Sequence, residues 1–84
     1  MSGPARQPLT RRQAEVLAAA SDGVPLRVVA QRLGITRERV AARLSEAYGR
    51  LDVAWMDRSE RRAAAVRIAR KRGLIPNEPN QEAA

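Results

Sequence analysis

The chain contains no cysteine and no histidine. Without cysteine it has no disulfide, no thiolate nucleophile and no cysteine-ligated zinc, and without histidine it lacks the commonest general base and metal ligand. Its carboxylates are scattered along the sequence, and no two of them have the pattern of an acid/base pair. The sequence therefore predicts that the protein is not an enzyme and that it holds no metal and no cofactor.

Aromatic residues and long apolar runs are also scarce. Phenylalanine is absent, and Tyr48 and Trp55 are the only aromatic side chains. The core must then be built from Leu, Val, Ile and Ala, and the lack of alternating β-branched and aromatic residues favours an all-α fold. No apolar run approaches the roughly 20 residues that cross a bilayer, and no signal peptide is visible. We therefore expect a cytoplasmic protein.

Positive charge is what the sequence has in excess. The formal net charge is +7, from 16 basic and 9 acidic side chains, and Lys71 is the only basic residue that is not arginine. A surface so rich in guanidinium groups favours a polyanionic partner such as nucleic acid. The bias toward arginine and alanine is also typical of a GC-rich bacterial or phage genome.

The 84 residues divide into one small domain and two polar ends. Residues 1–8 hold two prolines and one glycine, and they predict a flexible N-terminal arm. The polar residues 76–84 predict a disordered tail that has no means of packing. Between them, residues 9–75 form a single domain with room for one modest core.

Capping signals divide this domain into four helices. Thr10 and Gln13 have the spacing of a capping box, Thr36 is suited to cap the third helix, and Asp57 and Ser59 are rival caps for the fourth. The expected helices cover about 11–21, 25–33, 36–51 and 57–73.

The second and third helices have the pattern of a helix-turn-helix. Ala30 permits the close approach of the two helices, and Gly34 permits the sharp turn between them. Apolar residues face inward in the expected order, at Val29, Leu33, Ile35, Val40 and Leu44, and the third helix continues the stripe through Ala47, Tyr48 and Leu51. An ordinary helical hairpin is the alternative, but the full spacing together with the arginine excess favours a DNA-binding motif.

A longer ordered set of residues identifies a likeness to a known family. These residues are Leu9-Thr10, Glu15-Val16-Leu17, Gly23, Val29-Ala30, Leu33, Ile35-Thr36, Val40, Leu44, Tyr48, Arg50-Leu51, Ala65-Val66, Ala69 and Gly73-Leu74. Over 8–75 the chain thus resembles the LuxR/GerE-type helix-turn-helix domain, and among these the short stand-alone GerE type. The chain is longer than the family pattern between Val53 and Arg62. The arginine at position 43 also resembles the pattern of the helix-turn-helix in sigma-factor region four, which is the nearest rival family.

The resemblance implies an all-α, four-helix LuxR/GerE-like fold with the third helix in the major groove of DNA. It places base reading near Ala41 and Ser45, and Arg37 at the start of that helix is the best candidate for a bidentate contact with guanine. The other expected DNA-binding residues clamp phosphates or line the groove: Thr36, Glu38, Arg39, Ala42, Arg43, Arg50, Arg27, Arg11 and Arg12. We also count Arg32 among the clamps and expect Glu46 to pair with Arg43 or Arg50. A merely solvated basic flank is the alternative.

Two further surfaces are predicted outside the helix-turn-helix. The resemblance assigns the last helix to dimerisation, and we expect a homodimer to use Ala64, Ala65, Ile68 and Arg72. The alternative is that this apolar arc is buried by its own domain. Trp55 is expected to plug the open end of the small core, or else to anchor a protein partner such as RNA polymerase.

Together these features predict a nucleoid-associated transcriptional regulator that binds double-stranded DNA with some influence of sequence and places helix 36–51 in the major groove. The rival function is a protein-interaction module of the same fold in which base reading is weakened. Such a module would act as an RNA polymerase-binding factor or an anti-activator.

Overall fold

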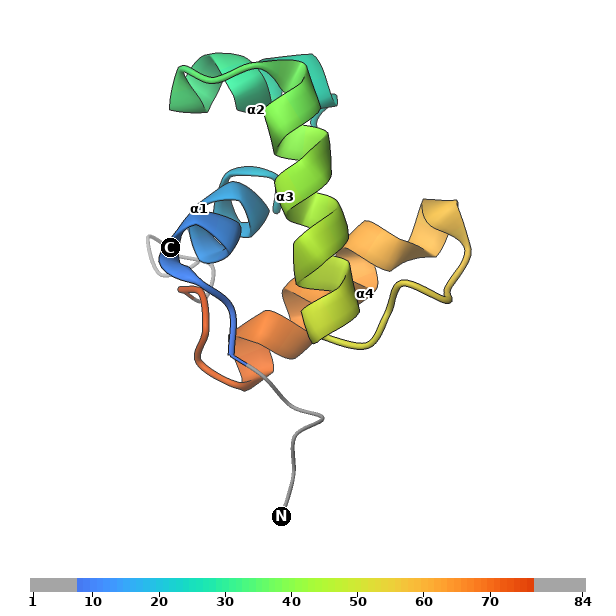
Figure 1. Cartoon of the computed structure of the whole chain (residues 1–84). Coiled ribbons are helices and arrows are strands. Elements are labelled where there is room, and N and C mark those ends of the chain that lie inside the picture. Colours follow the sequence, from blue (N-terminus) through green and yellow to red (C-terminus); the bar gives the residue numbers. More distant parts are fainter. Residues whose placement is uncertain (1–7, 77–84) are drawn as a thin grey trace, which may run out of the picture.

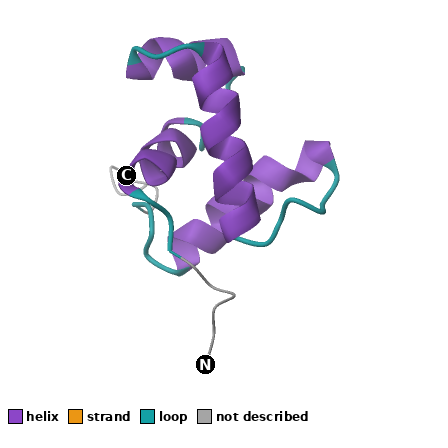
Figure 2. Ribbon diagram, in the orientation of Figure 1, coloured by secondary structure: helices purple, strands orange, loops and turns teal. Residues whose placement is uncertain are grey.

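The computed structural model describes residues 8–76, and these residues form four helices and no strand (Figures 1 and 2). The helices are α1 (Arg11–Ala19), α2 (Leu26–Leu33), α3 (Arg37–Arg50) and α4 (Arg58–Lys71). The predicted all-α fold class is confirmed, and each helix lies within its expected bounds. Apart from Pro8 and Pro76, the predicted arm 1–8 and tail 76–84 lie outside the described residues.

Side-chain caps define where α1 and α3 begin. The Thr10 hydroxyl accepts a hydrogen bond from the Gln13 backbone N–H at 3.1 Å, and the Gln13 side-chain oxygen accepts one from the Thr10 N–H at 3.0 Å. The Thr36 hydroxyl likewise accepts from the Arg39 N–H at 3.1 Å. Both predicted caps are confirmed. We had expected Pro25 to lie in the first turn of α2, but it directly precedes the first residue of this helix.

The start of α4 differs from the expectation of a side-chain cap. Asp57 occupies the N-cap position, but its side chain makes no capping hydrogen bond. Its carboxylate instead accepts a hydrogen bond from the Ser59 hydroxyl at 2.8 Å. The two residues that we had expected to compete for the cap therefore bind each other.

The turn between α2 and α3 sets how the two helices cross. Gly34 has φ 69°, a left-handed conformation that costs glycine little. The Ile35 N–H donates to the Ala30 carbonyl at 3.1 Å, which closes a Schellman turn at the end of α2. The chain then reverses so that α2 lies across the N-terminal end of α3 (Figure 1).

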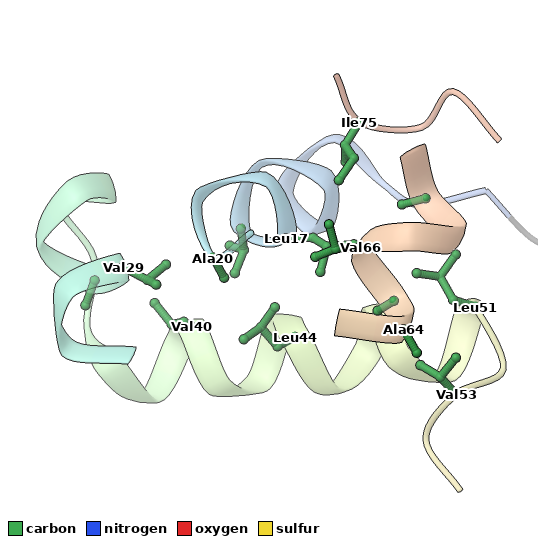
Figure 3. Close-up of a cluster of buried hydrophobic side chains, with 14 residues drawn as sticks. Leu17, Ala20, Val29, Val40, Leu44, Leu51, Val53, Ala64, Val66 and Ile75 are labelled. Atoms are coloured by element: carbon green, nitrogen blue, oxygen red, sulfur yellow. The ribbon is translucent and has the colours of Figure 1, made fainter. Parts of the chain in front are cut away.

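Helix α3 is the element against which the other three helices pack. Four members of the apolar stripe predicted on it are buried, namely Val40, Leu44, Ala47 and Leu51, and the fifth, Tyr48, is half-buried. Side chains from α1, α2 and α4 and from the loops beside them complete the core around this stripe (Figure 3): Leu17, Ala20, Val29, Val53, Ala64, Val66 and Ile75. Every structural element of the domain is therefore held through one face of α3.

Burial in this core predicts a large effect for a single truncation. The Leu17 side chain is fully buried, so Leu17→Ala removes apolar contacts and leaves a cavity. We expect it to lower the free energy of unfolding by about 2–5 kcal/mol. Glu15→Ala, on the exposed side of the same helix, is the matched control and should change it by less than about 0.5 kcal/mol. Urea unfolding followed by circular dichroism measures both, and equal effects would contradict this core assignment.

Candidate nucleic-acid interface

The face of α3 that points away from the core carries small or short side chains. Glu38, Ala42, Ser45 and Gly49 are exposed there, and Ala41 is exposed beside them. At 100° per residue these positions form one continuous strip along the helix. No long side chain other than Glu38 projects from it, so the backbone of α3 is accessible to a partner over much of its length.

One flank of this strip faces α1 and carries arginine. Arg39 is exposed, and Arg43 and Arg50 are half-buried on the same side of α3. Arg43 lines a hollow of about 90 Å³ together with Arg12 from α1. The Arg50 guanidinium donates a hydrogen bond to the Pro8 carbonyl at 2.8 Å. The structure therefore places a cation of α1 and a cation of α3 around one hollow.

The carboxylate on this flank has a different partner from the one expected. Glu46 accepts a hydrogen bond from the Gln13 side-chain amide at 3.1 Å. The capping box orients Gln13, which is only 5% exposed, so that its amide group points at α3. The predicted ion pair with Arg43 or Arg50 is wrong for the described residues, because α1 holds Glu46.

Arg32, which we had counted among the phosphate clamps, has partners within the domain. Its two terminal nitrogens donate to the two carboxylate oxygens of Asp22 at 3.1 and 2.9 Å, and one of them also donates to the Ala19 carbonyl at 2.8 Å. These bonds tie α2 to the turn after α1. The hydrogen bond from Arg32 lowers the pKa of Asp22, so Asp22 stays ionised and the charge of Arg32 is compensated within the domain.

The opposite flank of α3 borders a second, larger hollow. It measures about 240 Å³ and lies between α3 and the start of α4. Its polar and small lining residues are Ala41, Ser45, Tyr48, Arg58, Arg61 and Arg62. The three α4 arginines are not among the residues predicted from the sequence to bind DNA, although their spacing places them on one side of the first helical turns.

Two of these arginines are held in place by the backbone around them. The Arg61 guanidinium donates twice to the Met56 carbonyl, at 3.0 and 3.3 Å, and its central carbon lies 5.7 Å from the centre of the Tyr48 ring. That distance is typical of a cation–π contact. Arg62 donates to the Val24 carbonyl at 2.6 Å. Both side chains are therefore oriented before any partner arrives.

The remaining expected DNA-binding residues are at the surface. Arg37 is exposed in the first turn of α3, directly after the Thr36 cap. Arg27 is exposed in the first turn of α2, and Arg11 and Arg12 are exposed at the start of α1. All of them lie at the N-terminal ends of helices, where the free backbone N–H groups also favour an anion.

Trp55 is not part of the core, contrary to our first expectation. Its side chain is 76% exposed, and its indole N–H donates to the Asp52 carbonyl at 2.8 Å. Asp52 has φ 62°, and the Val53 N–H donates to the Tyr48 carbonyl at 2.9 Å, which is a Schellman turn at the end of α3. This turn directs Val53 into the core, so Val53 closes the end that we had assigned to Trp55.

The residues expected at a dimer interface divide into two groups. Ala64 and Ala65 are 3% and 0% exposed and pack in the core of their own domain. This corrects their expected role, because their side chains are not at the surface. Ile68 is half-buried and Arg72 is exposed, and a dimer through α4 would rest on these two.

Comparison with known proteins adds no identification: no family model, no curated protein and no solved structure matches the chain. The likeness to LuxR/GerE-type domains therefore stays a prediction from the residues. Within residues 8–76, no helix has the length and hydropathy needed to cross a membrane, and no group of three or more acidic side chains is placed to hold a metal ion.

Tyr48 reports on the larger hollow through its ionisation. Burial raises the pKa of its hydroxyl above the ordinary value near 10, and it outweighs the nearby charges of Arg62 and Arg61, which lower it. Because the folded state holds the phenol proton more tightly, this contribution to stability is complete below pH 10. It is lost as the pH rises through the folded-state pKa.

Since Tyr48 is the only tyrosine, an ultraviolet titration observes it alone. We expect the phenolate band to develop above pH 10 in the folded protein and near pH 10 in urea. A lower midpoint for the folded protein than for the unfolded chain would show that the arginines dominate, and it would contradict the burial of this hydroxyl.

Proposed function

We propose that the domain binds double-stranded DNA by placing α3 in the major groove, and that it regulates transcription. The observation that carries this proposal is the exposed strip of short side chains on α3, bordered by Arg37, Arg39 and Arg43. The major groove is about 12 Å wide and a helix with its side chains is about 10–12 Å across. A helix with a strip of short side chains fits that space, and arginines on its border meet phosphates.

The fold that we propose is of the LuxR/GerE type. The order of the four helices and the turn at Gly34 support it, as do the residues that carry the resemblance. In this arrangement α2 supports α3 from behind and crosses its N-terminal end, the position from which a first helix contacts the DNA backbone in helix-turn-helix proteins.

Different residues supply affinity and sequence reading in this proposal. The arginines on the α1 side contact phosphates, which position the domain without reading sequence. Arg37 reads a guanine edge, Ser45 bonds a base edge and Ala41 contacts a thymine methyl group. Since only one of these three makes a bidentate contact, we expect modest sequence preference with a contribution from DNA shape.

Salt dependence tests the electrostatic part of the proposal. About six phosphate contacts predict that log affinity falls linearly with log salt, with a slope of about −5 for a 20-base-pair duplex. Arg43→Ala should lower this slope by about one unit on every sequence. Fluorescence anisotropy measures both, and a wild-type affinity that does not respond to salt would contradict DNA binding.

Arg37→Ala is the matched comparison, because it removes the same charge from the same helix. If Arg37 reads guanine, the variant loses about 1–3 kcal/mol on a duplex selected from a random pool and much less on unselected DNA. Equal losses on both duplexes would show that Arg37 is only a phosphate contact. Both variants should keep the helical circular dichroism of the wild type, since neither side chain belongs to the core.

The exposure of Trp55 favours a second candidate function. A tryptophan that is 76% exposed has the large apolar surface typical of a protein-binding hot spot. Its indole is held on the loop by the bond to Asp52, so little ordering is needed on binding. In this alternative the domain binds RNA polymerase or another regulator through the loop 52–57.

Trp55 is the only tryptophan, so 5-hydroxytryptophan incorporated in its place can be excited at wavelengths where the tryptophans of a partner do not absorb, and its fluorescence separates the two functions. In the isolated protein we expect iodide to quench it readily. Protein binding through this loop predicts that RNA polymerase shields the indole from iodide and that Trp55→Ala abolishes the complex while leaving the thermal unfolding midpoint unchanged. Continued quenching in the presence of RNA polymerase would contradict this second function.

A further inference from the structure

We infer that the hollow between α3 and the start of α4 binds a phosphate group of the second DNA strand. The inference rests on the proposed function, because it assumes that α3 lies in the major groove. It adds an element to the interface that neither the residue pattern nor the helix-turn-helix itself assigns: the first turns of α4, with Arg58 and Arg61 as the phosphate ligands.

The two flanks of α3 differ in the cations that they offer to the two DNA strands. A helix of about 10–12 Å in a groove of about 12 Å lies between two sugar–phosphate backbones, one along each flank. The flank toward α1 has its own cations in Arg39, Arg43 and Arg50. Past its first turn, the other flank of α3 offers only Ala41, Ser45 and Tyr48. Cations for the second strand must therefore come from another element.

The start of α4 supplies those cations where they are needed. Arg58, Arg61 and Arg62 line the same hollow as Ala41 and Ser45 of α3. Among the described residues that line it, none is Asp or Glu. The two neighbouring hollows differ in this respect, because Asp22 lines one and Glu15 lines the other. Of these three hollows, the one beside the exposed strip of α3 combines several arginines with no carboxylate among its described lining residues.

The hollow is also prepared for a phosphodiester group. Its volume of about 240 Å³ leaves room for a phosphate and part of its sugar. The two hydrogen bonds to Met56 and the contact with Tyr48 hold the Arg61 guanidinium in place. Arg58 is exposed and free to close over the group, where its guanidinium can donate charge-assisted hydrogen bonds to the phosphate oxygens.

Arg58→Ala tests the site, with Arg67→Ala as the matched control. Both residues are exposed arginines of α4, and nine positions at 100° place them on opposite sides of the helix. We expect Arg58→Ala to reduce the salt slope for a 20-base-pair duplex by about one unit. Affinity should fall about tenfold at low salt, as for the loss of one charge-assisted hydrogen bond. Arg67→Ala should change neither quantity.

The outcomes of these measurements distinguish failure of the phosphate site from failure of DNA binding. Equal effects of Arg58→Ala and Arg67→Ala would show that only net charge matters and would overturn the site while leaving DNA binding intact. A wild-type protein that binds no duplex would overturn the proposed function as well. Arg61→Ala, checked by thermal unfolding, should act like Arg58→Ala. Tight binding of inorganic phosphate alone, detected by calorimetry and lost in Arg58→Ala, would identify a free-anion site and contradict the assignment to DNA.

Discussion

The inner stripe of α3 is the constraint on which the rest of the structure depends. Val40, Leu44, Ala47 and Leu51 bury one side of this helix against α1, α2 and α4. Because the core is built around this stripe, α3 cannot shift without unpacking it. The same rigidity serves the exposed side, because a helix anchored along its whole length presents its outer residues and both flanks at fixed positions. Stability and the proposed DNA contacts therefore depend on two sides of one helix.

Arginine has two separate uses in this small domain. Arg32 and Arg62 bind backbone carbonyls and connect α2 and α4 to the turn that follows α1, which supplies cross-links that a core rich in alanine does not provide. Others, such as Arg37 and Arg58, are exposed at the beginnings of α3 and α4. The formal charge of the chain thus overstates what is available to a partner. Exposed arginines lie on both sides of the outer strip of α3, and others lie farther along α4 and at its end, at Arg67 and Arg72.

Local signals made the helices predictable from the sequence, whereas side-chain partners across the fold were not. The Thr10 box, the Thr36 cap and the stripe of α3 depend on residues close together in the chain, and all are confirmed. Trp55 was misassigned because Asp52 adopts a left-handed conformation that directs Val53 into the core. The sequence has no glycine at this position to indicate such a turn. The partner of Glu46 lies on α1, and the α4 arginines meet α3 only after the extra loop has folded. DNA binding itself stays a proposal, since the positions of these residues in the fold do not reveal which partner they bind.

Mapping amide chemical shifts during a titration with a 16-base-pair duplex tests the central claim most directly, because each element reports separately. If α3 enters the major groove between two strands, the amides of α3, the start of α1 and the first turns of α4 should shift together at one stoichiometry. The C-terminal half of α4 and the loop around Trp55 should stay unchanged. Shifts confined to the Trp55 loop, or no shifts along the outer strip of α3, would contradict the account.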